Sequence, residues 1–161
     1  MKKLEYEIIE LPKITDPRGN LTVAEQMKNV PFDIKRVYWT YDVPGGESRG
    51  GHAHKALYQL IVAMSGSFTV TLDNGWERKT VLLNHPWQGL LIKPGLWRTL
   101  DDFSSGAVCM VIASELFDLE DYIYGTRISS SMSTKQTSKR ATAKSPSKHI
   151  HQMERETNKS E

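Results

Sequence analysis

Short runs of apolar residues, rich in β-branched and aromatic side chains, follow one another along most of residues 1–128. Alternating apolar and polar positions are typical of a strand that buries one face. Many short strands separated by turn signals indicate a sandwich or a barrel. The sequence therefore predicts an all-β domain, and its clearest strands are LTVAEQ, IKRVYWTYDV, ALYQLIVAMSG, SFTVTLD, KTVLLN, QGLLIKPG and AVCMVIAS.

Turn-forming residues stand between these runs. The sequence DNG at residues 73–75 predicts a hairpin connection, and KPG at residues 93–95 predicts another chain reversal. Segment 114–123, SELFDLEDYI, is the convincing helical candidate, because Ser114 can cap a helix N-terminus. Apolar residues follow at helical spacing, namely Leu116, Leu119 and Ile123. We expect a short C-terminal helix there.

The last part of the chain differs from the rest in composition. Residues 129–161 are crowded with Ser, Thr and Lys and lack apolar periodicity, which is typical of disorder. They hold seven of the 21 Lys and Arg residues and three of the 19 Asp and Glu residues, so residues 1–128 keep 14 basic and 16 acidic residues. We expect one domain over residues 1–128 and a disordered tail over residues 129–161.

Composition and charge argue against several classes of partner. The basic excess belongs to the tail, so it gives little support for nucleic-acid binding by the domain. No window reaches the ~18 apolar residues of a membrane span, and the first residues lack the apolar core of a secretion signal. We expect a cytoplasmic protein with no membrane partner. The lone cysteine, Cys109, stands in an apolar run and is predicted to be a buried thiol.

Two histidines, His52 and His54, stand one residue apart just before an apolar run. In an extended chain, residues i and i+2 point to the same side, so both imidazoles would face the same space. The spacing alone is a weak signal, because His149 and His151 repeat it in the tail with no strand around them. The surrounding residues must decide between a metal site, a proton-transfer pair and two hydrogen-bonded core histidines.

A longer template surrounds the histidine pair. Residues 46–66, GESRGGHAHKALYQLIVAMSG, resemble the first signature of the cupin superfamily, with Gln59 in place of the usual Glu. The run KPGLWR resembles the end of the second signature, with Arg98 in place of the usual His. The resemblance implies a cupin fold, which is a double-stranded β-helix or jelly-roll barrel whose strands direct these side chains into a small barrel.

The two substitutions bear on the choice between metal and proton. A cupin metal centre takes both strand histidines, the Glu and the last His, whereas this chain offers an amide at Gln59 and a guanidinium at Arg98. A guanidinium stays protonated, so it cannot bind a cation and would repel one. Two imidazoles alone are a poor site for a divalent metal. We expect no metal, and we expect acid–base chemistry by the histidines instead.

The resemblance extends beyond these signatures. The segments DPRGNL, NVPFDIKRVYWTYDVPGG, SRGGHAHK, SGSFTVTLDNG, GLLIKPGLWRTLDDFS and VIASELFDLEDYI resemble the sugar nucleotide 3,4-ketoisomerases over roughly residues 4–127. This resemblance implies an isomerase that moves the keto group of dTDP-4-dehydro-6-deoxy-glucose from C4 to C3 without metal or organic cofactor. It also implies a homodimer, and a product that leads to 3-amino-3,6-dideoxy sugars of surface polysaccharides such as O-antigens and S-layer glycans.

The same resemblance implies roles for individual residues. His52 matches the catalytic base, His54 its partner, and Tyr38 of RVYW the tyrosine that helps to move protons. The side chains that we expect to bind the substrate are Arg18, Arg49, Arg98 and Gln59. The chain departs from the family at Gly51, where members usually carry an aromatic residue, and in the tail, which has no counterpart.

Other functions stay open at this point. A metal-dependent cupin enzyme does not account for Gln59 and Arg98. A non-catalytic sugar-binding cupin would be favoured if the histidines were fully hydrogen-bonded to protein groups. A related 3,5-epimerase of the same sugar nucleotides also uses a His base, but no further resemblance supports it. The sequence leaves open the C4 configuration of the product.

Overall fold

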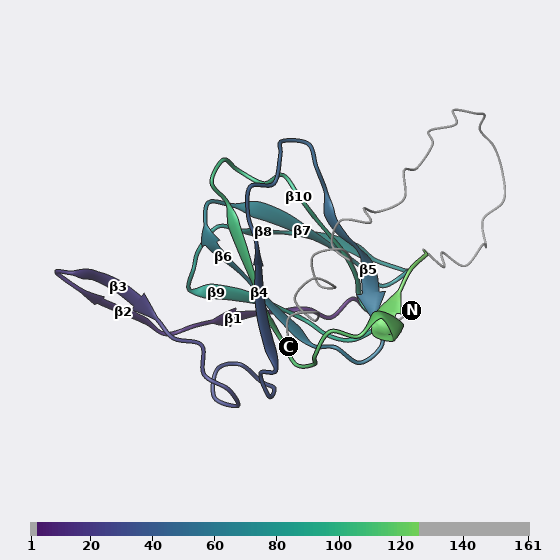
Figure 1. The fold of residues 1–161 in the computed structure, drawn as a ribbon, viewed down its shortest axis with the longest axis horizontal. Coiled ribbons are helices and arrows are strands. Elements are labelled where there is room, and N and C mark those ends of the chain that lie inside the picture. Colours follow the sequence, from purple (N-terminus) through teal and green to yellow (C-terminus); the bar gives the residue numbers. More distant parts are fainter. Residues whose placement is uncertain (1–2, 126–161) are drawn as a thin grey trace, which may run out of the picture. The chain divides into compact units, whose positions relative to one another are not determined.

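The computed structural model describes residues 3–125, and strands dominate this part of the chain (Figure 1). One antiparallel sheet has the order β1 (Glu7–Glu10), β9 (Gln88–Ile92), β6 (Gln59–Ser65), β11 (Val108–Ala113) and β4 (Arg36–Thr40). A second has the order β12 (Tyr122–Ile123), β5 (Arg49–His54), β10 (Trp97–Asp101), β7 (Phe68–Asp73) and β8 (Arg78–Leu83). From β4 to β12 the chain alternates between the two sheets, except at the β7–β8 hairpin. The predicted all-β class is confirmed.

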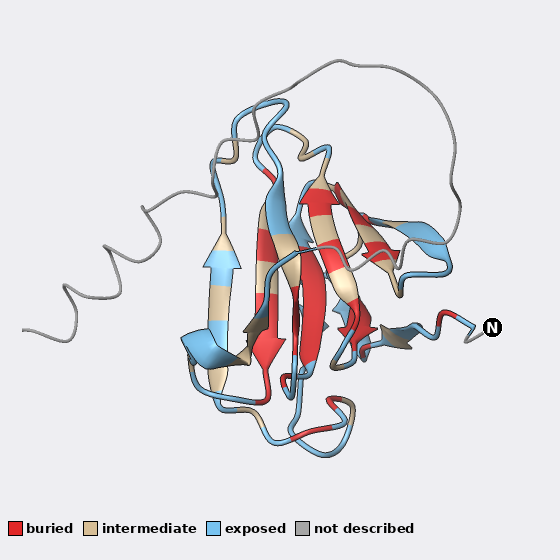
Figure 2. Ribbon diagram, turned by 90° about the vertical axis from the view of Figure 1, so that its right-hand side faces the viewer, coloured by how far each residue is buried: buried red, intermediate tan, exposed pale blue. Residues whose placement is uncertain are grey.

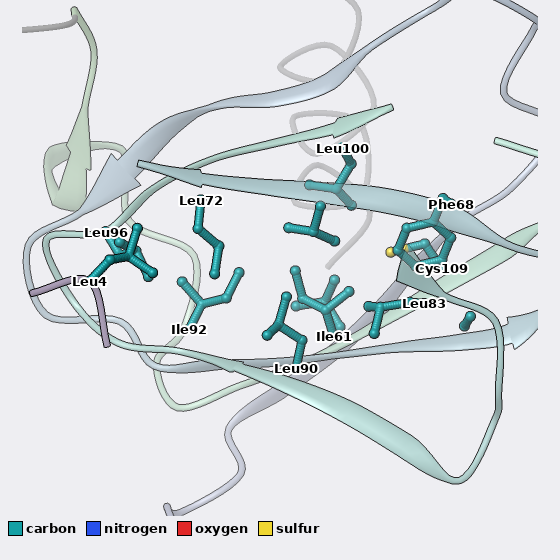
Figure 3. Close-up of a cluster of buried hydrophobic side chains, with 13 residues drawn as sticks. Leu4, Ile61, Phe68, Leu72, Leu83, Leu90, Ile92, Leu96, Leu100 and Cys109 are labelled. Atoms are coloured by element: carbon teal, nitrogen blue, oxygen red, sulfur yellow. The ribbon is translucent and has the colours of Figure 1, made fainter. Parts of the chain in front are cut away.

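The main core lies between the two sheets, and strand alternation explains how it forms. In β7 the residues Phe68, Val70 and Leu72 are buried, whereas the residues between them are partly exposed. Because successive side chains point to opposite faces, one face of β7 is apolar and meets the other sheet. Figure 3 shows this cluster, in which the Phe68 ring lies beside the Cys109 sulfur. The prediction that Cys109 is a buried thiol is confirmed, and burial raises its pKa to about 12.

Strand β6 is buried on both faces from Gln59 to Ala63. Ile61 and Ala63 belong to the main core, whereas Leu60 and Val62 point to the opposite face of the sheet. A second apolar cluster covers that face, formed with Leu11, Val30, Phe32, Leu91 and Ile112. Figure 2 shows the buried residues concentrated on the central strands. Alternation therefore places Gln59 on the inner face, together with Ile61.

The two predicted turns take different parts in the fold. Residues 74–77 connect β7 to β8 as a hairpin, as expected, and the Asp73 carboxylate accepts a hydrogen bond of 2.7 Å from the Gly75 N–H. Residues 93–95 turn the chain between β9 and β10, and the Gly95 N–H donates to the His54 carbonyl oxygen at 2.7 Å. The second turn thus ties the end of β5 to the start of β10.

A hairpin of β2 (Lys13–Asp16) and β3 (Gly19–Thr22) forms a separate two-stranded sheet. It extends away from the two large sheets (Figure 1). Its apolar residues Ile14 and Leu21 pair with each other and are both more than half exposed. The hairpin therefore contributes nothing to the main core.

The predicted C-terminal helix is wrong. Segment 114–123 contains only a single 3-10 turn, η1 (Leu119–Asp121), followed by the short strand β12. The apolar residues at helical spacing have no common surface to cover, since Leu116 and Leu119 are exposed. Ser114 does not cap a helix: its N–H donates to the Tyr58 carbonyl oxygen and its hydroxyl accepts from the Tyr58 N–H, just before the start of β6. Pairing of β12 with β5 satisfies the backbone that a helix would otherwise have satisfied.

The predicted tail, with His149 and His151, and the predicted boundary at residue 128 lie outside the described residues. Within residues 3–125, no helix has the length and apolar character needed to cross a membrane.

Candidate active site

A β-bulge in β5 sets the direction of the histidine pair. His52 lies opposite Arg98 of β10, but Gly50 lies opposite the next residue, Thr99, so that Gly51 is the extra residue of the bulge. Both glycines have left-handed backbone angles, with φ of 81° at Gly50 and 75° at Gly51. A Cβ on Gly50 would meet the Arg98 carbonyl oxygen at 2.9 Å, whereas one on Gly51 would meet no atom within 4 Å. The absence of a side chain at position 51 thus fits the bulge.

The bulge also changes the face on which Arg49 lies. Residues directly opposite each other in neighbouring strands share a face, and Arg49 pairs with Leu100, a member of the main core. Simple alternation would have placed Arg49 and His52 on opposite faces, because they are three residues apart. Arg49 instead lies on the same face as His52, at the exposed start of the strand.

The two imidazoles lie close together, next to strand β12. Their ring centroids are 4.9 Å apart and the rings are nearly perpendicular. The Tyr122 ring of β12 lies 4.7 Å from the His52 ring and 4.4 Å from the His54 ring. His54 is 3% exposed, and its Nδ1 lies 2.9 Å from an Asp121 carboxylate oxygen. His54 Nε2 is buried and has no hydrogen-bond partner among the described residues.

A chain of hydrogen bonds joins the two sheets beside the histidines. Arg98 of β10 donates from Nη1 to the His52 carbonyl oxygen at 3.0 Å, and from Nη2 to the Gln59 side-chain oxygen. The Gln59 amide nitrogen donates to the Tyr38 hydroxyl at 2.8 Å. Gln59 therefore uses both halves of its amide, which a carboxylate could not do, because it has no N–H. Tyr38, His52, His54, Gln59 and Arg98 are called the polar cluster below.

Burial and the Arg98 charge keep both histidines neutral at pH 7. Burial, Arg98 and His54 lower the pKa of His52 to about 3, although a hydrogen bond with the Gly50 backbone opposes this change. Burial and Arg98 lower the pKa of His54 to about 4, although Asp121 opposes this change. Burial raises the pKa of Tyr38 to about 12, and Arg98, whose pKa burial lowers to about 10, remains a cation. The cluster thus contains neutral bases, a neutral phenol and one fixed positive charge.

The donor groups do not suit a divalent cation. Among residues 3–125, no group of three His, Cys, Asp or Glu side chains is arranged to hold a metal ion. The Gln59 oxygen accepts from the Arg98 guanidinium, so a cation between the histidines would meet that positive charge.

The expected substrate-binding residues divide into two groups. Gln59 and Arg98 lie in the polar cluster, and both are buried. Arg49 lies on the same face as His52, at the exposed start of β5. Arg18 is not brought to the cluster: its side chain is 90% exposed at the turn of the β2–β3 hairpin, where it pairs with Asp16 at 2.7 Å.

Comparisons with known proteins give the family. The family model described as "FdtA: WxcM-like, C-terminal" matches residues 4–130, which is well over half of the chain. The chain belongs to this family. A 3,4-ketoisomerase from Helicobacter canadensis has a similar structure, with a TM-score of 0.74 and 38% sequence identity, and the match covers 76% of this chain and 92% of that chain.

Two further proteins that are similar to this chain carry more detailed names. The TDP-4-oxo-6-deoxy-alpha-D-glucose-3,4-oxoisomerase from Aneurinibacillus thermoaerophilus is 46% identical over 120 residues, which is 74% of this chain and 86% of the relative. A histidine-to-asparagine mutant of the 3,4-ketoisomerase QdtA from Thermoanaerobacterium thermosaccharolyticum, in complex with TDP-4-keto-6-deoxyglucose, has a TM-score of 0.73 and 40% identity over 74% of this chain and 87% of that chain. This chain is therefore an isomerase with the cupin fold.

Sequence reasoning missed two residues that contact the histidines, Asp121 and Tyr122. Both belong to the segment that was expected to be helical, and Asp121 is separated from His54 by 67 positions. The available signal was the acidic and aromatic run EDYI, which has the composition of a strand end as much as that of a helix. Only the pairing of β12 with β5 brings this run to the site.

Proposed function

We propose that this protein is a cofactor-free 3,4-ketoisomerase that converts dTDP-4-dehydro-6-deoxy-glucose into a dTDP-3-dehydro-6-deoxy-hexose. The observation that carries this proposal is the pair of neutral imidazoles, 4.9 Å apart, beside a buried guanidinium and a phenol. The names of the relatives support the substrate, since one acts on a TDP-4-oxo-6-deoxy sugar and another was captured with TDP-4-keto-6-deoxyglucose.

The reaction moves two protons and leaves the composition of the sugar unchanged. A base removes the proton from C3, the electron pair of that C–H bond forms the C3–C4 double bond, and the C4 oxygen takes a proton. The resulting enediol then loses the proton of the C3 hydroxyl, the C3 carbonyl forms, and C4 receives a proton. In our proposal His52 exchanges the carbon protons, and His54 or Tyr38 carries the proton from one oxygen to the other.

The low basicity of the histidines has a compensating benefit. The Arg98 charge lowers their pKa, but the same charge stabilises the negative oxygen that develops as the C3 proton leaves. Each positioned acid–base group typically contributes on the order of 10²–10⁴-fold to the rate. The Tyr38 hydroxyl accepts from Gln59, so its own O–H is directed to a different acceptor, which suits a relay.

The substrate is anionic, and arginine side chains fit its diphosphate. A guanidinium binds phosphate oxygens through paired N–H groups. Arg49 is exposed on the same face as His52, so it is our candidate for this contact. Arg98 would act on the sugar oxygens, because it is buried next to His52. We propose Arg18 as a further contact from the resemblance alone.

We further propose a cytoplasmic homodimer whose product is used to make 3-amino-3,6-dideoxy sugars of surface polysaccharides. Strand β4 is the edge of its sheet and exposes Val37 and Trp39, and Tyr41 directly after the strand is exposed as well, which favours association through that edge. Light scattering at micromolar concentration should give the mass of two chains. The mass of a single chain would contradict the dimer without affecting the proposed reaction.

The deciding experiment is incubation of the purified protein with dTDP-4-dehydro-6-deoxy-glucose, with the product identified by NMR. We expect a 3-keto product, incorporation of deuterium at C3 of the substrate in deuterium oxide, and full activity after treatment with a chelator. Tight binding without exchange or isomerisation would favour the sugar-binding module. Loss of activity on chelation, restored by a metal, would favour a metal-dependent enzyme.

A further inference from the structure

Asp121 connects the 3-10 turn to His54 and to the backbone that follows β5. One oxygen accepts from the Ala56 backbone N–H at 2.8 Å, and the other lies 2.9 Å from His54 Nδ1. The Asp121 carbonyl oxygen also accepts from the Lys55 N–H at 2.9 Å. The two residues that follow β5 therefore hold Asp121 by its carboxylate and its backbone, and the second carboxylate oxygen lies against the imidazole.

This contact fixes the tautomer of His54. A carboxylate can only accept a hydrogen bond, so His54 Nδ1 must carry the proton between them. In a neutral imidazole the other nitrogen then carries a lone pair. That nitrogen, Nε2, is one of two buried side-chain atoms without a hydrogen-bond partner among residues 3–125. Buried polar atoms are nearly always satisfied in folded proteins, so an unpaired acceptor beside His52 indicates a position that a bound ligand completes.

We infer that Asp121 is a positioning residue that holds His54 with Nε2 as the acceptor for a hydroxyl proton of the bound sugar. This inference rests on the proposed ketoisomerase function and divides the work of the two histidines. After His52 has taken the C3 proton, the C3 hydroxyl gives its proton to His54 Nε2, which makes an imidazolium, and Nε2 passes this proton to the C4 oxygen, so that His54 is neutral again. The electron pair left on the C3 oxygen then forms the C3 carbonyl, and the pair of the C3–C4 double bond takes the carbon proton from His52 to form the C4–H bond.

The Asp121 carboxylate has an electrostatic role as well as a geometric one. The transient imidazolium would face the positive side chains Arg98 and Arg36, both of which disfavour its charge. Asp121 is the group that favours the charged form, by its negative charge and by its hydrogen bond to Nδ1. Without it, the imidazole would be both free to change tautomer and less able to take a proton.

The test compares Asp121→Asn with Glu120→Gln. Both variants remove one negative charge from the same turn. The Glu120 side chain is exposed, and the bond from the Lys55 ammonium to Glu120 ends on the Glu120 backbone carbonyl oxygen, so Glu120→Gln leaves it in place. An Asn side chain can donate to Nδ1, which moves the proton of His54 to Nε2. We expect Asp121→Asn to lower kcat on the order of 10²–10⁴-fold with KM changed little, and Glu120→Gln to leave both unchanged. Asp121→Glu should recover part of the loss, because it keeps a carboxylate.

The tautomer itself is measured without substrate, by nitrogen-15 NMR of histidine-labelled protein, with the His54 signals assigned by their absence in His54→Asn. We expect a protonated Nδ1 and an unprotonated Nε2 in the wild-type protein, and the opposite tautomer in Asp121→Asn.

A wild-type His54 protonated at Nε2, or an unchanged tautomer in Asp121→Asn, would overturn the inference even if the enzyme isomerises its substrate. A wild-type protein that has the expected tautomer but does not isomerise would instead overturn the proposed function. Circular dichroism of each variant verifies that it is folded.

Discussion

The apolar core and the polar cluster lie between the same two sheets and differ in how their side chains are held. Core residues such as Phe68 and Cys109 make nondirectional contacts, and burial is enough to place them. The side chains of the polar cluster form directional bonds across strands, as from Arg98 to Gln59 and from Gln59 to Tyr38. The core therefore stabilises the fold through volume, whereas the cluster depends on the placement of individual atoms.

The buried polar atoms without partners add to this contrast. Among the described residues they are the Nε atom of Arg36 and the Nε2 atom of His54, and both lie by the polar cluster. An unpaired buried polar group lowers stability, typically by about 1–3 kcal/mol. These two atoms therefore lower the stability of the free protein, as expected if a bound substrate supplies the missing partners, as we propose. Substitutions in the polar cluster should mainly lower activity, whereas substitutions in the apolar core should mainly lower stability.

The largest effect on the rate is expected from His52→Asn. The guanidinium of Arg98 bonds to the His52 backbone oxygen, so the substitution leaves that contact in place. We expect kcat to fall on the order of 10²–10⁴-fold, with substrate binding and melting temperature nearly unchanged. Exchange of the C3 proton with deuterium oxide should fall equally.

The matched control is His85→Asn, which replaces a histidine that stacks on Trp87 at 4.4 Å, outside the polar cluster. It should keep full turnover. If His52→Asn retained normal C3 exchange, the base would be a different residue, and His54 would be the next candidate.

The largest effect on stability is expected from Phe68→Ala. Phe68 is fully buried and stacks on Phe103 with ring centroids 5.0 Å apart. Its removal should lower the free energy of unfolding by about 3–5 kcal/mol, measured by denaturant titration. The neighbouring Leu82→Ala is the control, because Leu82 is 56% exposed and should cost less than about 0.5 kcal/mol. A loss of kcat in the folded fraction of Phe68→Ala would show that the two regions are coupled.

The sequence pattern of a single strand predicts those features of the core and of the polar cluster that depend on that strand alone. The alternation in SFTVTLD places Phe68 in the core, and the two-residue spacing places His52 and His54 on one face. The bulge at Gly51 could not be predicted, because it is a property of the pairing with β10 rather than of β5 alone.

Contacts between segments that are distant in the sequence could not be predicted either. The bond from His54 to Asp121 forms only when β12 pairs with β5, and the same segment has apolar residues at helical spacing. The pattern therefore favoured the helix, although tertiary pairing determined the outcome. The location of Arg18 is a second example, since a motif gives no information on how far a hairpin extends from the sheets.

The pH dependence of kcat/KM is a smaller expected effect, and it reports on the histidines of the polar cluster. Free His has a pKa of 6.5, but His52 and His54 have values of about 3 and about 4 in the folded protein. As bases they must be neutral, so kcat/KM should stay constant between about pH 8 and pH 5 and fall only below that range. A fall in kcat/KM centred near pH 6.5 would show that the histidines titrate normally.

The same shift affects stability, with a sign that follows from proton linkage. The unfolded chain binds protons at these histidines below about pH 6.5, whereas the folded protein binds them only near pH 4 at His54 and near pH 3 at His52. The free energy of unfolding should therefore decrease as the pH falls from about 6.5 to about 3. The decrease should be smaller in the double variant His52→Asn with His54→Asn, which lacks both groups.

The smallest effect on function is expected at Cys109, the titratable group of the apolar core. Burial raises its pKa to about 12, so the thiolate that reacts with disulfide reagents is nearly absent at pH 8. We expect no labelling of the folded protein and one labelled thiol per chain after denaturation. Cys109→Ala should keep kcat and the C3 exchange rate unchanged, because Cys109 lies in the core beside Phe68 rather than in the polar cluster. Rapid labelling of the folded protein would show that the Cys109 thiol is accessible, and a large loss of kcat in Cys109→Ala would show that the apolar core and the polar cluster are coupled.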